Sequence, residues 1–336
     1  MILSIKQIIF AIIGVQVLLW AMTFDGNELV FLPQHNIPRL VISMSTFSTR
    51  IQVNALRTID LLLKGQEADS FIITVGLSHR NLDPNITCHY NDCMPEQNLK
   101  ELKNETEILY LFQEKFGKFD PVHCSSLLIH RSCYSCGKIY LQFLHDFDWG
   151  PATKLLGALL VERDSDTVVV TMDDDCDYSN GLAKKLAQRL PRRSVLGTSW
   201  QSVSIIDESA YGVFVNLQKE LMLHYRVASV LFDYENYGLR HFDAWLMGVG
   251  AVAYRVNYFE ADIWTYAQNV SPQCFYNDDV WVAGYLRKKF ITVYSVFILA
   301  LHNHHRHPTA SLSVIPHSQS TAGSWMMQCA LQNGFF

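Results

Sequence analysis

The sequence predicts an α/β fold in which helices cover both faces of a mostly parallel sheet. Leu40 to Ser45 and Phe71 to Val75 are apolar stretches with the length of buried strands, and Ile51 to Lys64 between them repeats its apolar residues at helical spacing. Strand, helix and strand in this order, with continuously apolar strands, indicate a parallel sheet that is covered on both faces. The 336 residues, 49% of them hydrophobic, are enough to bury a sizeable core.

The same alternation returns further along the chain. We expect strands at Lys138 to Leu144 and at Thr167 to Met172, a helix from Ala152 to Glu162 between them, and a late strand at Ile291 to Leu301. The stretch 78–137 interrupts this pattern, because it is polar and contains five of the eight cysteines and two of the three glycosylation sequons. It predicts a cysteine-rich insertion on the surface.

Cysteines and sequons together indicate an oxidising, glycosylating compartment. The sequons begin at Asn85, Asn104 and Asn269. Cys133 and Cys136 have the spacing of half a zinc site, but no second pair of cysteines matches it, so disulfides are favoured. The sequence leaves the disulfide connectivity open.

The N-terminal residues 1–24 form the predicted targeting segment. An apolar run from Ile8 to Phe24 follows Lys6, which is typical of an uncleaved signal-anchor, with a cleaved signal peptide as the alternative. The expected order after it is a short stem at 25–37, a main domain at 38–307 and a C-terminal tail at 308–336. We therefore expect a single-pass type II protein of the Golgi or endoplasmic reticulum membrane, with its main domain in the lumen.

Charge and hydropathy exclude two classes of protein. The chain has 27 Lys and Arg against 32 Asp and Glu, a net charge of −5, and no block of like charges, which argues against nucleic acid or an anionic membrane surface as the main partner. A mean hydropathy of +0.07 with one long apolar run excludes a polytopic membrane protein.

Three consecutive acids, Asp173, Asp174 and Asp175, follow the predicted strand Thr167 to Met172. Ligands of open parallel sheets bind beyond the carboxyl ends of the strands, where these acids would lie. Carboxylates at alternate positions, Asp173 and Asp175, can both face one hard divalent cation, which in turn binds phosphate oxygens.

Two simpler interpretations of these acids are available. One is a solvated acidic turn that ends the strand and caps a helix beginning near Ser179. The other is a calcium loop of the EF-hand type, but Tyr178 stands where that loop needs glycine and Lys184 where it needs a bidentate glutamate. The sequence therefore argues against the calcium loop and leaves the acidic turn open.

An Asp-x-Asp motif at a strand end, behind a signal-anchor, resembles the GT-A class of nucleotide-sugar-dependent glycosyltransferases. Within that class, Pro38 to Ile51 resembles the first strand and turn of family-2-like enzymes, and Trp149 to Leu159 resembles the helix that precedes their Asp-x-Asp strand. The likeness runs from about residue 38 to about residue 300, without the cysteine-rich insertion. It implies a GT-A fold with a Rossmann-like nucleotide-binding half and an acceptor half.

The resemblance also implies a reaction and its participants. The donor would be a nucleotide-diphospho-sugar, the cofactor Mn²⁺ or Mg²⁺, and the acceptor a hydroxyl of a glycan, glycoprotein or glycolipid, with inversion at the sugar. Asp175 would hold the metal directly, and Asp173 would reach the ribose or a metal-bound water. The other expected nucleotide-binding residues are Thr46, Arg50, Lys154 and Asp174. For Lys154, an ordinary solvated helical lysine is an equal alternative.

An inverting transferase also needs a base that deprotonates the acceptor hydroxyl. Asp278 and Asp279, in a segment that resembles the acidic motif at the start of a helix in the acceptor half, are the candidates. We assign Asp279 as base and Asp278 as its neighbour or as a ligand of the acceptor hydroxyl. Helix capping is the structural alternative, and a helix N-terminus would lower the carboxylate pKa unless the site is desolvated.

Two further features have both a structural and a functional interpretation. The glycine-rich stretch Trp245 to Arg255 resembles a strand that lines the donor sugar, and Trp245 either stacks on that sugar or, as its apolar setting favours, belongs to the core. His302 and His304, in a run of four histidines within six residues, are candidates for a third metal ligand. A surface zinc site or a pH-sensitive patch is the alternative for these histidines.

Three functions remain open from the sequence. The first is a lumenal metal-dependent glycosyltransferase, which requires the acid triplet and the acid pair to meet. The second is a catalytically silent carbohydrate-binding or scaffold protein of the same fold. The third is a metal-dependent nucleotide-sugar hydrolase or phosphotransferase that combines the acids with the histidines.

Overall fold

A computed structural model of the chain describes ten stretches of it. They are 28–77, 104–124, 129–146, 149–198, 200–202, 237–241, 244–275, 277–296, 301–304 and 322–335. The predicted anchor, Ile8 to Phe24, lies outside these residues. Among the helices that are described, none has both the length and the apolar character needed to cross a bilayer.

A mixed sheet of eleven described strands runs through the molecule in the order β1-β11-β14-β9-β13-β7-β2-β3-β6-β5-β4. Its centre confirms the predicted parallel strands: β7 (Val168–Thr171), β2 (Leu40–Phe47), β3 (Ser70–Gly76) and β6 (Ile139–Leu144) all run in one direction. The fold is thus α/β as expected, but both flanks of its sheet contain antiparallel strands.

The strands on the β7 side are mixed in direction. β13 (Val252–Arg255) is antiparallel to both β7 and β9 (Ser194–Gly197), and β14 (Thr292–Val296) is parallel to β9. β11 (Tyr237–His241) then pairs antiparallel with β14. Two small sheets lie outside the main one, β10 (Trp200–Ser202) with β12 (Ala244–Leu246) and β8 (Cys176–Tyr178) with β15 (Leu301–His304).

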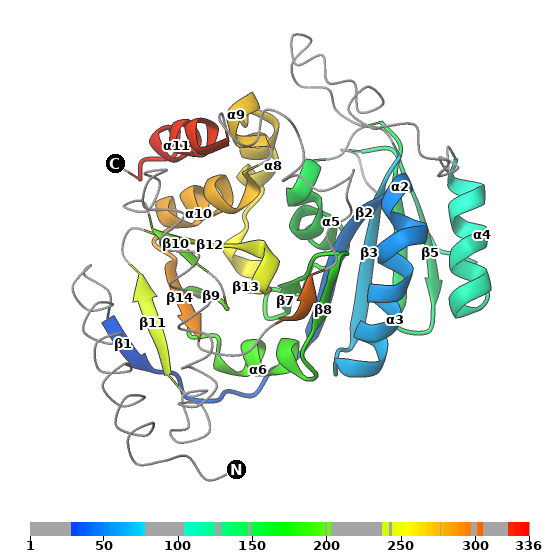
Figure 1. Cartoon of the computed structure of the whole chain (residues 1–336), viewed down its shortest axis with the longest axis horizontal. Helices are drawn as coiled ribbons and strands as arrows, with labels where there is room; N and C mark the ends of the chain where they lie inside the picture. The colour runs from blue at the N-terminus through cyan, green and yellow to red at the C-terminus, as the bar shows by residue number, and fades with distance from the viewer. Residues whose placement is uncertain are drawn as a thin grey trace.

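Helices cover both faces of the sheet, as the apolar strands predict (Figure 1). α3 (Leu56–Gly65), α4 (Glu105–Phe116) and α6 (Leu182–Arg189) share one hydrophobic cluster with alternate residues of β2 and β7. α5 (Thr153–Val161) and α10 (Asp278–Lys288) bury their apolar residues in a second cluster with β13. Because successive strand residues point to opposite faces, β13 supplies both clusters, with Ala253 in the first and Val252 and Tyr254 in the second.

The C-terminal half of the chain adds three helices beside α10. α8 (Asp262–Gln268), α9 (Pro272–Phe275) and α11 (Ala322–Gln332) gather on the same side of the molecule (Figure 1). A disulfide between Cys274 and Cys329 joins α9 to α11. Part of the predicted tail 308–336 is therefore a helix attached to the domain.

Much of the predicted insertion 78–137 is built into the main fold instead of lying on its surface. α4 buries Ile108 and Phe112, one turn apart, in the core, and β5 (Arg131–Cys136) with β4 (Asp120–Pro121) extends the sheet beyond β6. A polar sequence with cysteines hid this contribution, because only one stripe of α4 is apolar. Residues 78–103 and 125–128 lie outside the described residues.

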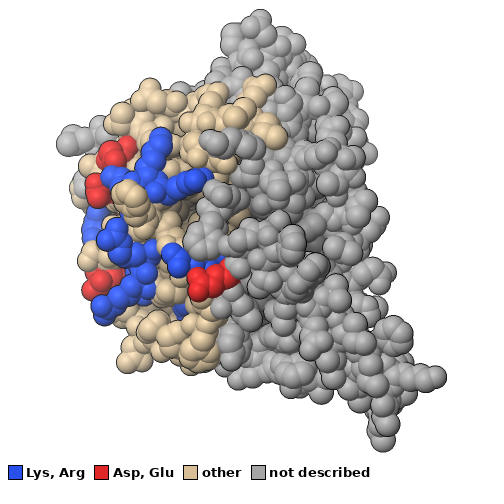
Figure 2. Space-filling view, turned by 90° about the vertical axis from the view of Figure 1, so that its left-hand side faces the viewer, with Lys and Arg blue, Asp and Glu red and all other residues tan. Residues whose placement is uncertain are grey.

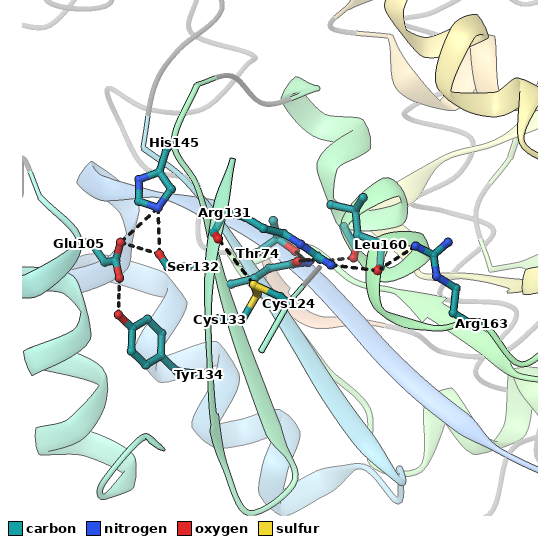
Figure 3. The surroundings of a disulfide bond; sticks show 12 residues. Thr74, Glu105, Cys124, Arg131, Ser132, Cys133, Tyr134, His145, Leu160 and Arg163 are labelled. Atoms are coloured by element: carbon teal, nitrogen blue, oxygen red, sulfur yellow. Dashed lines mark hydrogen bonds and ion pairs between the residues drawn. A yellow bond between two sulfur atoms is a disulfide. The ribbon is translucent and has the colours of Figure 1, made fainter. Parts of the chain in front are cut away.

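A disulfide and a small polar network join this segment together (Figure 3). Cys124 and Cys133 are disulfide-bonded, as favoured over a zinc site, while Cys136 is free. Glu105, in the first turn of α4, accepts hydrogen bonds from the hydroxyls of Ser132 (2.6 Å) and Tyr134 (2.5 Å) on β5. These bonds attach α4 to the edge of the sheet.

The predicted stem 25–37 is also largely part of the fold. β1 (Glu28–Phe31) is the edge strand next to β11, and Leu32 is buried at 2% exposure. The backbone N–H of His35 donates to the carbonyl of Gln188 at the end of α6 (2.7 Å). Glu28 is therefore already part of the sheet, ahead of the predicted domain boundary at residue 38.

Candidate active site

The candidate site lies where the order of the parallel strands reverses. From β2 the chain moves outward to β3 and β6, and then returns to β7 on the other side of β2. Ligands of such sheets bind in the crevice at this switch point, beyond the carboxyl ends of the two central strands. Thr46 lies one residue before the end of β2 and Arg50 follows that strand, whereas Asp173 to Asp175 follow β7. Strand topology thus brings these two predicted groups together.

Thr46 and Arg50 hold the middle and last acids of the triplet. The Thr46 hydroxyl donates to Asp174 Oδ2 at 2.6 Å, and Arg50 Nη2 lies 2.8 Å from Asp174 Oδ1 and also contacts Asp175. Arg50 ends α2 (Ser48–Arg50), directly before a π-helical turn, Ile51–Ala55, of the kind often found at functional sites. Burial raises the pKa of Asp174 to about 6, against the attraction of Arg50.

The acids of the triplet are not a solvated turn. Asp174 is 2% exposed and Asp175 is 6% exposed. The next acid, Asp177, is also buried and pairs with Arg57 at 2.7 Å. Asp177 continues the alternation of acids two residues after Asp175, but its described ion pair is with Arg57 and not with the cations that hold the triplet.

Lys154 links the acid triplet to the acid pair. Its Nζ lies 3.0 Å from Asp173 Oδ1 and 3.4 Å from Asp278 Oδ2, and the residue is 8% exposed. The alternative of a solvated lysine is therefore wrong. Burial by itself would lower the pKa of this ammonium group, but Asp173, Asp278 and Asp279 outweigh it and raise the pKa well above its usual value.

The glycine-rich stretch places a backbone donor on the second acid of the pair. Because β13 is antiparallel to β7, the turn Gly248–Gly250 that precedes it lies at the carboxyl edge of the sheet. The N–H of Gly248 donates to Asp279 Oδ1 at 2.9 Å. A Cβ on Gly248 would lie 2.4 Å from Lys154 Nζ, so only glycine fits without moving that side chain. Sequence interpretation assigned this stretch to the donor sugar and missed its contact with Asp279.

Asp278 and Asp279 begin α10, as predicted, but their pKa values move in the direction opposite to a simple helix cap. Burial, together with the neighbouring charge of Asp278, raises the pKa of Asp279 to about 8. Burial also raises the pKa of Asp278, against the attraction of Lys154. Desolvation therefore outweighs the effect of the helix N-terminus, and Asp279 has a pKa suited to general-base catalysis near neutral pH.

The first and third acids of the triplet fit a hard divalent ion. Ligand atoms of Asp173, Asp175 and Cys176 all lie within 4.8 Å of one another, a separation that a single ion can bridge. Burial raises the pKa of the Cys176 thiol, so it stays protonated and is a poor ligand beside two carboxylates. The hydroxyl of Tyr178 accepts a hydrogen bond from the Asp173 N–H at 2.7 Å and so fixes the backbone here.

The candidate histidines lie on a strand that runs beside the segment following the acid triplet. β15 pairs antiparallel with β8, which brings the backbone of His304 opposite Cys176, next to Asp175. A shift in register separates Leu301 from Asn303, so His302 lies at the irregularity. The side chains of His302 and His304 lie outside the description, and their role as ligands stays a prediction.

Trp245 belongs to the core, as its apolar setting favours. It is 1% exposed, and its ring lies 5.3 Å from that of Phe335, edge to face. Stacking of this ring on a donor sugar is therefore wrong.

The described cluster has a formal excess of negative charge. The described contacts join five carboxylates and two cations, which are Asp173, Asp174, Asp175, Asp278 and Asp279 with Arg50 and Lys154. Comparison of the chain with protein-family models finds no match, and comparison with curated proteins finds none either. The functional argument therefore depends on this geometry.

Proposed function

We propose that the chain is a metal-dependent glycosyltransferase of the GT-A type, which moves a sugar from a nucleotide-sugar donor to an acceptor hydroxyl. One observation carries the proposal: Lys154 joins the acids that follow β7 to the acids that begin α10, with both contacts below 3.5 Å. Sugar transfer needs the donor diphosphate and the base for the acceptor side by side, and this contact supports such an arrangement.

The acids after β7 suit the donor side of the reaction. Asp173 and Asp175 would hold Mn²⁺ or Mg²⁺, with His304 as a candidate third ligand. When bound, the ion would neutralise the charge that develops on the diphosphate leaving group. Thr46 and Arg50, at the carboxyl end of β2, would contact the nucleotide, and their contacts with Asp174 keep that acid in position.

The acids at the start of α10 suit the acceptor side. The N–H of Gly248 holds one oxygen of Asp279, which leaves the other to take the proton of an acceptor hydroxyl. A pKa of about 8 lets this carboxylate accept a proton in the neutral range and release it again. Asp278, held by Lys154, would orient the acceptor or the base. Attack from this side is compatible with inversion at the sugar.

The charge of the site favours an enzyme over a silent scaffold. Burying like charges together costs stability, and such strain is concentrated at functional sites. A scaffold has no need for five convergent carboxylates. The two disulfides among the described residues support an oxidising compartment for this activity.

Donor binding and turnover separate the roles of the two acid groups. Thermal shift of the full chain with a panel of UDP- and GDP-sugars, with and without Mn²⁺, should find a donor that stabilises the protein only when the metal is present. Asp175→Ala should abolish this shift, whereas Asp279→Asn should keep it and lose transfer by roughly 100-fold or more. Asp120→Ala, an exposed acid on β4, is the matched control and should change neither.

Two outcomes would contradict the proposal. If no nucleotide-sugar gives a metal-dependent shift, a scaffold of the same fold is the better explanation. If donor is consumed at the same rate with every acceptor omitted, and Asp279→Asn has no effect on that rate, the protein is a nucleotide-sugar hydrolase.

A further inference from the structure

Two loops at the amino ends of β9 and β14 form one strongly basic surface. Arg193, before β9, makes two hydrogen bonds to the loop before β14 and the first residue of that strand. Its carbonyl accepts one from the N–H of Thr292 at 3.0 Å, and its guanidinium donates one to the carbonyl of Lys289 at 3.4 Å. The described cations of this basic face are Arg192, Arg193, Arg255, Arg287, Lys288 and Lys289. Its acids are Glu260 and Asp262, both paired with Lys289 at 2.8 Å.

The basic face stands out against the charge of the chain. These described residues, six cations and two acids, carry a formal charge of +4, although the whole chain carries −5. Figure 2 shows Lys and Arg side chains gathered on this side of the molecule. The local excess is that of a surface for anionic groups.

An aromatic side chain projects from the middle of this face. Phe290 is 82% exposed and follows Lys289 in the loop after α10. It has φ of 56°, and Arg193 in the adjoining loop has φ of 54°, a left-handed conformation that glycine adopts at lower cost. The chain thus keeps an exposed aromatic and an arginine at positions where they strain the backbone, as expected of side chains with a role at a surface.

The strand that follows the N-terminal apolar segment begins near this same edge of the sheet. Glu28, the first residue of β1, is level with Arg240 on β11 and with Tyr294 on β14, two residues beyond Thr292. Strand spacing and rise put Glu28 roughly 12 Å from Thr292. Only residues 25–27 separate Glu28 from the apolar run that ends at Phe24, a reach of at most about 14 Å. A segment inserted in a bilayer would therefore hold this edge close to the membrane surface.

We propose that the basic face docks on the phospholipid bilayer into which the N-terminal segment inserts. Phe290 lies at the level of the headgroups, and the arginines and lysines contact headgroup phosphates. This orientation leaves the candidate site facing away from the membrane, because the acids lie at the carboxyl ends of strands that run parallel to β9 and β14. The proposal depends on the predicted anchor and not on the proposed transferase activity.

Photo-crosslinking tests which residues touch lipid. The full chain, with p-benzoyl-phenylalanine at position 290, is reconstituted in phosphatidylcholine vesicles in which one lipid in five is phosphatidylserine. The matched control has the probe in place of Tyr110, an aromatic residue of α4 that is 59% exposed at the opposite end of the sheet. We expect lipid adducts at position 290 and few or none at position 110. Equal labelling at the two positions, or no lipid adduct at position 290, overturns the proposal.

Charge variants test the role of the arginines in the same assay. Arg192→Glu with Arg193→Glu should lower lipid labelling at position 290 by roughly fivefold or more for each charge removed. Lys115→Glu with Lys118→Glu, on the far side of the molecule, changes the charge equally and should leave labelling unchanged. Unfolding midpoints of both variants verify that the fold is intact. Undiminished labelling in the arginine variant, or crosslinking of position 290 to a protein instead of lipid, contradicts the proposal.

Discussion

Replacing Lys154 by methionine tests whether the two acid groups form one electrostatic unit. Methionine keeps the length and the apolar stem of the side chain but removes its charge. In the structure the ammonium group lies between Asp173 and Asp278, at 3.0 and 3.4 Å, and the side chain is only 10% exposed. The substitution would leave these carboxylates without their shared cation.

The expected loss of stability follows from this geometry. Removing one partner of a buried ion pair costs about 3 to 5 kcal/mol, because the remaining charge stays desolvated and unpaired. In a domain of this size such a loss lowers the unfolding midpoint by roughly 5 to 15 °C. Lys64→Met is the matched control: Lys64 pairs with Asp60 at 2.7 Å but its side chain is 70% exposed, so its loss should cost less than about 1 kcal/mol.

Two conditions should narrow the difference in unfolding midpoint between Lys154→Met and the unaltered chain. Saturating Mn²⁺ should raise the midpoint of the variant more, because the ion replaces part of the missing positive charge. Lowering the pH from about 8 to about 5 should also narrow this difference. Asp278 and Asp279 have raised pKa values, so they lose their negative charge at a higher pH than an ordinary aspartate does. Calorimetry or circular dichroism measures these midpoints. If Lys154→Met and Lys64→Met have the same unfolding midpoint near pH 8, the two acid groups do not share Lys154, which refutes the prediction.

Three further predictions concern the base, its backbone donor and the C-terminal helix. Because the pKa of Asp279 is raised from 3.8 to about 8, the transfer rate should rise with pH and level off above about 8; a profile that is flat from about pH 6 to 9 would remove Asp279 as base. The same shift means that the folded chain keeps a proton that the unfolded chain loses, so this residue lowers stability progressively as pH rises from about 4 to about 8. Gly248→Ala should displace Lys154 and lower kcat while metal-dependent donor binding persists, measured by steady-state kinetics and thermal shift. Cys274→Ser with Cys329→Ser should destabilise the fold by roughly 4 kcal/mol, because the loop closed by this disulfide is long; unchanged denaturant unfolding would show that α11 needs no tether.

The central strands and the helix that carries the acid pair can be predicted from the sequence. β2, β3, β6 and β7 are buried on both faces, so their apolar runs identify them without reference to their neighbours. The short antiparallel strands β1 and β13 are harder to identify, because β1 is a partly exposed edge strand and the buried β13 is only four residues long. They are strands because of the partners they pair with, and those partners are distant in the chain.

Segments with mixed composition were assigned less well. The polar residues and cysteines of 78–137 predict an insertion, yet α4 needs only the stripe that includes Ile108 and Phe112 to join the core. The expected stem at 25–37 begins the sheet for a similar reason, since four residues of β1 and the buried Leu32 are too short a signal to distinguish from a linker.

Local chemistry determined which residues form the candidate site: acids that follow a buried strand, and acids that begin a helix, are evident from their order along the chain. Only the tertiary structure decided how they relate to one another. Lys154 joins Asp173 to Asp278, and Gly248 contacts Asp279, because the reversal of strand order and the antiparallel β13 bring four distant segments to one edge of the sheet. The pKa values of these acids depend on the burial and charge that this convergence creates, and no single segment of the sequence contains that information.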